Sequence, residues 1–455
     1  MTPIIVKSID LKRFDALAAH TRSPAAAYIS EEIAWYANES ETVLGVLLRD
    51  KIDNDFVGVL LGRDESGMYR CIDVQASIET AEEATTWLEG AIRWNSRDDV
   101  KTFPQGNRDK PVDPFEPISP IEKLGASFVK IQREAVFAPA RRIISEIMPH
   151  FVDIDGNFLE QFQTTGFDAR LWELYLFSYL NEEQLFIDRT HNRPDFVVTK
   201  YAETVAIEAT IVGRRKDNPV SFFKTELKLL HPEEIRERQA HEIPIRFGSP
   251  LFSKLKKEYW KLEHVKGKPL VLAIADFHDD QSMLWTSTAL INYLFGVRHD
   301  HHFDADGKLV IEPIQLDKHE LDGKVIPSGF FFQPDAENVS AIMFSASGTI
   351  SKFNRIGRQA GFNAPGVIMF RFGTHHDHNP NANLPKPFKY LVDESCNETW
   401  AEGLSMFHNP NAKHPVPQHL FPSIAHHRFV GGQIASELPE FHPYASQTIH
   451  LQASK

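Results

Sequence analysis

The sequence predicts a mixed α+β protein, of α/β class in its middle part, and three observations lead to this fold class. Residues 32–74 alternate apolar and polar side chains between turn signals, as in a small antiparallel sheet. Residues 166–183 are apolar almost all round, which is typical of a helix packed inside the fold. Residues 269–277 form a continuous apolar run, which suits a strand in a sheet that helices cover on both faces.

The length predicts more than one domain, because 455 residues exceed what one hydrophobic core normally supports. The alternating region, with an amphipathic helix at residues 80–94, predicts an N-terminal α+β accessory domain at residues 1–105. Residues 103–120 are dense in proline and charge and are the expected linker. A core domain at residues 121–295 and a C-terminal extension packed on it, residues 296–455, would follow.

The composition indicates a reducing compartment. Cys71 and Cys396 are the only cysteines, and they lie far apart without metal-type spacing, so no disulfide framework is expected. The first residues lack the apolar segment of a signal peptide, and no apolar run approaches the roughly 20 residues of a membrane span. We therefore expect a cytoplasmic protein with no membrane partner.

The middle of the chain predicts the order helix, three strands, helix, strand, and it places two acids on neighbouring strands. Asp195 begins one β-type run, and Glu208 stands near the end of the next. If the intervening turn makes these strands antiparallel, the two carboxylates converge at one end of the sheet. Such a pair suits Mg²⁺ or Mn²⁺, which take one or two carboxylates together with water and substrate phosphate. The alternative is that both acids are solvated residues that bracket a hairpin.

The stretch Pro194-Asp195, followed by the strand that ends Ile207-Glu208-Ala209-Thr210, resembles the motif of the PD-(D/E)XK, or restriction-endonuclease-like, nuclease superfamily. The resemblance covers residues 157–276 and includes the order of helices and strands. It implies a restriction-endonuclease-like core in which Asp195 and Glu208 bind the metal. It also implies that Glu173, on the preceding helix, joins them. An ion pair with Arg170, one turn earlier, is the alternative for Glu173.

Thr210 departs from this motif, which has lysine at that position. Because threonine carries no charge, either activity has been lost or the cation comes from elsewhere. Residues 251–268 are rich in lysine and predict a helix whose apolar residues face the sheet. We expect Lys254 or Lys257 to supply the missing charge, with Lys200 as a weaker candidate; a solvated or phosphate-contacting face is the alternative.

Other basic residues predict contacts to a nucleic-acid backbone. The net charge of −13 excludes a surface that is basic all over, but local basic faces remain. The candidates for phosphate contacts are Arg214, Arg215, Lys216, Lys256 and Lys261. A second stripe at helical spacing consists of Lys352, Arg355 and Arg358. For the turn at residues 214–216, simple solvation is the alternative.

These features together predict a metal-dependent endonuclease that hydrolyses phosphodiester bonds in nucleic acid, with DNA as the expected substrate and either a monomer or a homodimer as the active form. Defence against foreign DNA and DNA repair are both consistent with such an enzyme. Thr210 and the acidic net charge support a second hypothesis, a non-catalytic nucleic-acid- or protein-binding module that retains the nuclease fold. A scaffold without a nucleic-acid role is the third.

Overall fold

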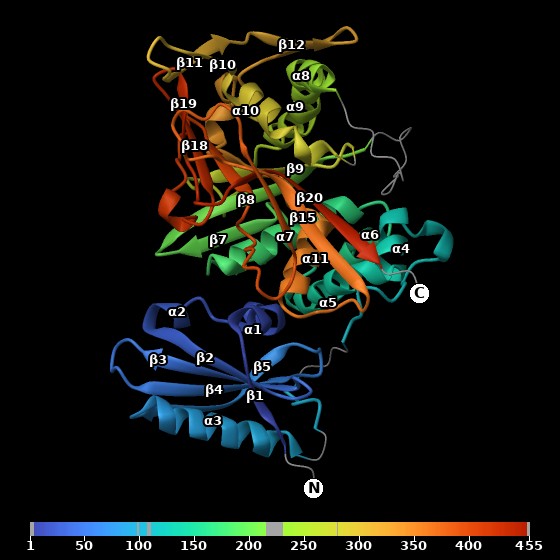
Figure 1. Ribbon diagram of the computed structural model, residues 1–455, viewed down its shortest axis with the longest axis vertical. Helices are drawn as coiled ribbons and strands as arrows, with labels where there is room; N and C mark the ends of the chain where they lie inside the picture. Colours follow the sequence, from blue (N-terminus) through green and yellow to red (C-terminus); the bar gives the residue numbers. More distant parts are fainter. Residues whose placement is uncertain (1–3, 98–99, 107–110, 215–230, 280, 453–455) are drawn as a thin grey trace.

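The computed structural model describes residues 4–97, 100–106, 111–214, 231–279 and 281–452 (Figure 1). Its N-terminal part is an antiparallel sheet of order β1-β2-β3-β4-β5. The strands are β1 (Val6–Ile9), β2 (Ser30–Asn38), β3 (Val43–Asp50), β4 (Phe56–Arg63) and β5 (Tyr69–Ile78), and the helices are α1 (Leu11–Ala18), α2 (Ala26–Ile29) and α3 (Ala81–Asn95). Helix α3 covers one face of the sheet, and α1 and α2 lie between the sheet and the rest of the molecule (Figure 1).

The predicted helix at residues 80–94 corresponds to α3, and its start has a local cause. The Thr80 hydroxyl accepts a hydrogen bond from the backbone N–H of Glu83, and two glutamates stand in the first turn. A capping hydroxyl and early acidic residues both stabilise the positive end of a helix.

The N-terminal part packs against the remainder of the chain. Arg63 forms two hydrogen bonds of 2.9 Å with the carboxylate of Glu146 in α5. The His20 ring stacks on Phe177 of α7 at 5.2 Å. Within the predicted linker, Phe103 donates its backbone N–H to Arg63, and Phe115 is buried. The described residues of this proline-rich segment are therefore anchored at both ends.

An eight-stranded mixed sheet of order β19-β18-β17-β14-β9-β8-β7-β6 forms the centre of the molecule. Strands β7 and β8 are antiparallel, as predicted, while β8, β9 and β14 run parallel to one another. The sheet runs across the predicted boundary at residue 295, because four of its strands, β14, β17, β18 and β19, come from the C-terminal region. Its strands are β6 (Phe186–Asp188), β7 (Phe196–Lys200), β8 (Glu203–Val212), β9 (Leu270–Asp276), β14 (Ala341–Ser345), β17 (Leu404–His408), β18 (Ala425–Val430) and β19 (Gln433–Glu437).

Helices cover both faces of this sheet. Alternate residues of β8 point to opposite faces: Ile207 and Ala209 join a core with α7, whereas Ala206 and Val212 join a second core with α9 and α10. All residues of α7 from Leu171 to Leu180 are buried, which explains its almost wholly apolar sequence. The helices are α4 (Ala126–Arg133), α5 (Ala138–Ile147), α6 (Phe158–Gln163), α7 (Phe167–Glu182), α8 (Pro232–Ala240), α9 (Glu242–Leu255), α10 (Ser287–Phe295) and α11 (Ile350–Gln359).

The predicted lysine-rich helix at residues 251–268 is wrong in its extent. Helix α9 begins at Glu242 and ends at Leu255. Beyond it, Glu258 adopts a left-handed conformation with φ of 48° and leads into a single 3₁₀ turn, Tyr259–Lys261. The left-handed residue stops the helix and turns the chain, so that Tyr259 is buried under the sheet while most of the lysines remain exposed.

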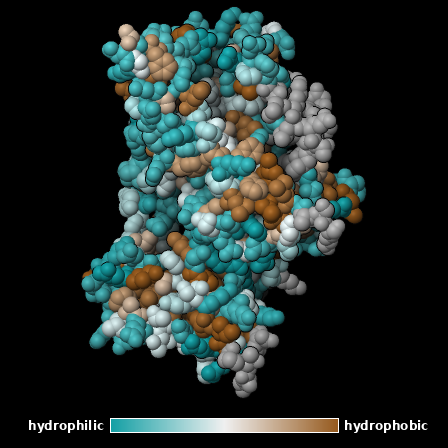
Figure 2. Space-filling view, in the orientation of Figure 1, coloured by the Kyte–Doolittle hydropathy of each residue, from teal (hydrophilic) through white to brown (hydrophobic). Residues whose placement is uncertain are grey.

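The periphery consists of smaller sheets. They are formed by β10 (Val297–Phe303) with β11 (Leu309–Gln315), by β12 (Lys318–Leu321) with β13 (Lys324–Pro327), and by β16 (Lys386–Leu391), β15 (Val367–His375) and β20 (Pro443–Gln452). Apolar side chains gather on the surface over β15 and β20, where Ile368, Ile449 and Leu451 are exposed (Figure 2). Among the described residues, no helix has the length and apolar character that crossing a membrane requires.

Candidate functional site

Asp195 and Glu208 lie on neighbouring antiparallel strands. Phe196 pairs with Ile207 across β7 and β8, so Asp195 and Glu208 are the next two residues in that register. The Asp195 carboxylate accepts a hydrogen bond of 2.7 Å from the backbone N–H of Ala209. This bond crosses from one strand to the residue that follows Glu208, and it brings the two acids to the same part of the sheet.

The carboxylate of Glu208 has two donors. Glu208 is 4% exposed, and its Oε1 atom accepts hydrogen bonds from the ammonium of Lys254 and, at 2.6 Å, from the hydroxyl of Tyr259. Lys254 comes from the last turn of α9, and Tyr259 comes from the 3₁₀ turn that follows the left-handed Glu258. The sequence predicts the lysine as a candidate, but no sequence pattern indicates a role for the hydroxyl of Tyr259.

The other two predicted lysines do not contact the acids. The ammonium of Lys257 lies 6.0 Å from the centre of the Tyr259 ring, and its side chain is exposed. Lys200 donates to the backbone carbonyl of Glu183 at 2.7 Å. Thr210 is partly exposed on the same face of β8 as Glu208, two residues further along. The positive charge next to Glu208 is therefore that of Lys254 on the neighbouring helix.

Glu173 is the third acid in this region. It is 7% exposed on α7, and its Oε1 atom accepts a 2.7 Å hydrogen bond from Arg170, the ion pair expected from the spacing of the two residues. Its Oε2 atom is buried and has no hydrogen-bond partner among the described residues. Burial raises the pKa of Glu173, with a contribution from the charge of Glu208, against the opposing effect of Arg170. One oxygen of Glu173 thus remains available to a ligand.

The pKa of Asp195 is shifted by burial and by the charges of the other two acids, Glu208 and Glu173. Burial, together with the negative charges of Glu208 and Glu173, raises the pKa of Asp195 from its usual value to about 7. The hydrogen bond from Ala209 and the charge of Lys254 act in the opposite direction. Since carboxylates that crowd together resist ionisation, this cluster is short of positive charge.

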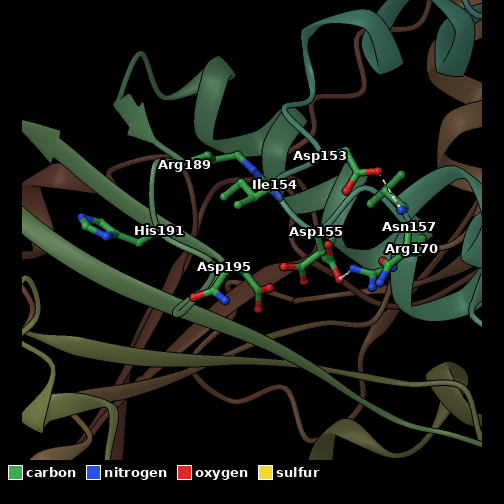
Figure 3. A pocket seen from close by; sticks show the side chains of 11 residues that line it. Asp153, Ile154, Asp155, Asn157, Arg170, Arg189, His191 and Asp195 are labelled. Atoms are coloured by element: carbon green, nitrogen blue, oxygen red, sulfur yellow. Dashed lines mark hydrogen bonds and ion pairs between the residues drawn. The ribbon is translucent and has the colours of Figure 1, made fainter.

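A pocket opens beside Asp195 and Glu173 (Figure 3). Asp195, Arg170 and Arg189 reach it from three different segments of the chain. The other side chains that line it are those of Asp153, Ile154, Asp155, Asn157, Phe158, His191 and Asn192. Arg189 follows the short strand β6, and no sequence motif indicates it.

The predicted phosphate contacts that the structure describes are Lys256, Lys261 and Arg214. Lys256 and Lys261 are exposed, and Lys261 pairs with Glu258 at 2.7 Å. Arg214 is partly exposed just beyond β8, and the other two predicted contacts, Arg215 and Lys216, lie outside the described residues. Neither Lys256 nor Lys261 forms a hydrogen bond or ion pair with Asp195, Glu208 or Glu173 in the part of the chain that the structure describes.

The predicted stripe on α11 is wrong. Lys352 and Arg355 are almost wholly buried and pair with the carboxylate of Glu398, at 3.0 and 2.7 Å. Arg358 bonds the side chain of Asn363. Glu398 lies 43 residues beyond Arg355, so the basic spacing on α11 serves a buried ion cluster and not a phosphate-contacting surface.

Within the ranges that the structure describes, no three His, Cys, Asp or Glu side chains form a ready-made metal-binding group. Comparison of the chain with protein-family models, curated proteins and solved structures gives no match. The resemblance to the PD-(D/E)XK superfamily therefore rests on the sequence motif and the order of elements.

Proposed function

We propose that the chain is a metal-dependent phosphodiesterase acting on nucleic acid, with DNA as the expected substrate. The observation that carries the proposal is the hydrogen bond from Lys254 to Glu208 beside Asp195. Lys254, in α9, would supply the positive charge that is missing at the motif position of Thr210. Catalytic sites often contain buried acids with raised pKa values beside a lysine. Asp195 has such a raised pKa, and Lys254 is the adjacent lysine.

The side chains of the cluster are of the chemical kind that a hard divalent cation prefers, although the described residues do not form a ready-made metal-binding group. Asp195 and Glu208 would hold Mg²⁺ or Mn²⁺, with the unpartnered Oε2 of Glu173 as a further oxygen, directly or through water. Two or three carboxylate oxygens leave the remaining positions for water and for a substrate phosphate, as Mg²⁺ prefers. When bound, the ion would polarise a phosphoryl oxygen and activate water for attack.

The surrounding side chains would position these groups. Tyr259 and Lys254 fix the orientation of the Glu208 carboxylate, and Arg170 does the same for Glu173. The ammonium of Lys254 would offset the negative charge that builds on the phosphoryl oxygens in the transition state. It comes from outside the strand and would stand in for the lysine that the usual motif has at the position of Thr210.

The non-catalytic alternative is favoured by one observation. Lys254 and Tyr259 both bond to the same oxygen of Glu208, which commits the lysine to the carboxylate and away from a substrate. In that case the chain would bind nucleic acid without cleaving it.

A cleavage assay separates the two functions. Supercoiled plasmid and linear duplex DNA are incubated with the protein in Mg²⁺, in Mn²⁺ and in EDTA, and each mixture is also analysed for a mobility shift in Ca²⁺. The proposal expects cleavage with Mg²⁺ or Mn²⁺, none with EDTA, and none with Asp195→Ala. A salt-sensitive shift without cleavage would support the binding module instead.

A further inference from the structure

Arg189 lies in the pocket beside the acidic cluster. It follows β6 and lines the same pocket as Asp195 and Glu173 (Figure 3). Its guanidinium packs over the rings of Phe151, at 3.8 Å, and Phe196, at 5.0 Å. Two aromatic rings hold the planar group in one orientation.

The guanidinium of Arg189 has donors without acceptors. Its Nε and Nη1 atoms are buried and make no hydrogen bond within the described residues. Buried donors are nearly always paired in folded proteins, so such atoms mark a place where a ligand or water belongs. Across the same pocket, the Oε2 atom of Glu173 is also buried and unpartnered.

The second arginine of the pocket is already committed. Arg170 donates to the carboxylate of Glu173 at 2.7 Å and to the side-chain oxygen of Gln161 at 2.6 and 3.0 Å. Arg189 lies within electrostatic reach of Glu173, Asp195 and Asp153 and pairs with none of them at hydrogen-bond distance in the described structure. Of the two guanidinium groups in the pocket, that of Arg189 is therefore the one with buried donors that have no acceptor among the described residues.

We infer that Arg189 binds a phosphate of the nucleic-acid backbone next to the acidic cluster. The inference rests on the proposed function for its substrate class and adds the residue that recognises it. A planar guanidinium presents paired N–H donors that match two oxygens of one phosphate. A cation held by the carboxylates would offset their charge, and the same phosphate could then face both the cation and Arg189.

Binding experiments with a neutral substitution test this role. A fluorescein-labelled 20-base-pair DNA duplex is titrated with protein in Ca²⁺, which replaces Mg²⁺, between 50 and 300 mM KCl. Arg189→Gln and Arg189→Met are compared with wild type and with Arg93→Met, whose side chain is 48% exposed on α3. We expect the two Arg189 variants to bind about tenfold more weakly and to lower the slope of log K against log salt by about 0.9, with Arg93→Met unchanged.

A second measurement does not depend on the folding of a variant. Single backbone phosphates of the duplex are replaced in turn by uncharged methylphosphonate, and the affinity of the wild-type protein is measured for each duplex. One or two positions should weaken binding, and the loss at one of them should disappear in Arg189→Gln. An unchanged salt slope in folded Arg189 variants, or identical methylphosphonate profiles, would overturn the inference, as would the absence of DNA binding by the wild type.

The outcomes distinguish this inference from the proposed function. Mg²⁺-dependent cleavage with an unchanged salt slope in the Arg189 variants would leave the nuclease intact and remove the phosphate contact. A changed slope in a protein that never cleaves would leave the phosphate contact and remove the hydrolysis.

Discussion

Lys254, in the last turn of α9, donates a hydrogen bond from its ammonium to the carboxylate of Glu208, 46 residues earlier on β8. The bond joins a helix to the strand that it covers, and it places a positive charge beside Glu208, near enough to Asp195 to oppose the rise in the pKa of that carboxyl. The side chain of Lys254 is 18% exposed, whereas that of Glu208 is 6% exposed. A lysine in this place can stabilise the carboxylate or a developing phosphoryl charge, and substitutions separate these roles.

Lys254→Met should reduce cleavage on the order of 10²-fold or more, the scale expected for loss of one preorganised charge. Lys257→Met is the matched control: it removes an equal charge three residues away and should cleave at the wild-type rate, because Lys257 is exposed. Initial rates on a defined duplex give the comparison. Thr210→Lys, combined with Lys254→Met, should restore part of the rate; equal rates for both single variants would show that Lys254 has no catalytic part.

Tyr259→Phe should lower the cleavage rate about tenfold, because it removes one of the two donors that orient Glu208. Burial and the neighbouring charge of Glu208 raise the pKa of Tyr259, so its hydroxyl remains a donor throughout the pH range of an assay. Tyr201→Phe is the control, because Tyr201 is 59% exposed. If Tyr259→Phe leaves both the rate and its pH dependence unchanged, the hydroxyl only fills space.

The raised pKa of Asp195 predicts a pH dependence of stability. Because its pKa is raised from 3.8 to about 7 in the folded state, the folded protein holds a proton between these values that the unfolded chain releases. The stability that this group contributes is therefore lost as pH rises toward 7. In EDTA, Asp195→Asn should melt a few degrees, roughly 2–6 °C, above wild type at pH 8 and near it at pH 4. A difference in melting temperature between the two proteins that is the same at pH 4 and at pH 8 would contradict this prediction.

The buried ion cluster on α11 should govern stability without taking part in the site. Although burial opposes it, Arg355, Arg371 and Lys352 hold the pKa of Glu398 well below its usual range. Glu398→Gln removes the carboxylate that pairs with Lys352 and Arg355 and should cost about 3–5 kcal/mol in free energy of unfolding. Glu337→Gln, in an exposed pair with Lys413, should cost about 0–1 kcal/mol. Urea denaturation of both variants measures the difference, and similar midpoints would refute it.

The parts of the fold that the sequence predicts are those with local periodicity. The α+β class, the helix at α3, the antiparallel β7 and β8 and the covered sheet follow from patterns within a few residues. The restriction-endonuclease-like core stays a prediction, because the order of elements agrees with it but no solved structure matches. The predicted domain boundaries stay predictions too, although the central sheet runs across one of them.

The site was predictable where its residues carried a charge in a recognisable pattern. Asp195, Glu208 and Lys254 stood out for this reason, and Tyr259 did not, since its position depends on a left-handed residue, Glu258, that ends the helix earlier than periodicity indicates. Lys352 and Arg355 were misassigned because their partner, Glu398, is distant in sequence. Pairing between distant residues cannot be read from spacing.

The central claim, that the acidic cluster holds a divalent cation, is tested most directly by calorimetric titration of the metal-free protein with Mn²⁺ and Mg²⁺. The wild-type protein should bind at least one ion per chain. Asp195→Ala and Glu208→Gln should each lose that binding, and Glu394→Gln, a change outside the cluster, should retain it. Equal binding by all four proteins, or no binding by the wild type, would contradict the claim.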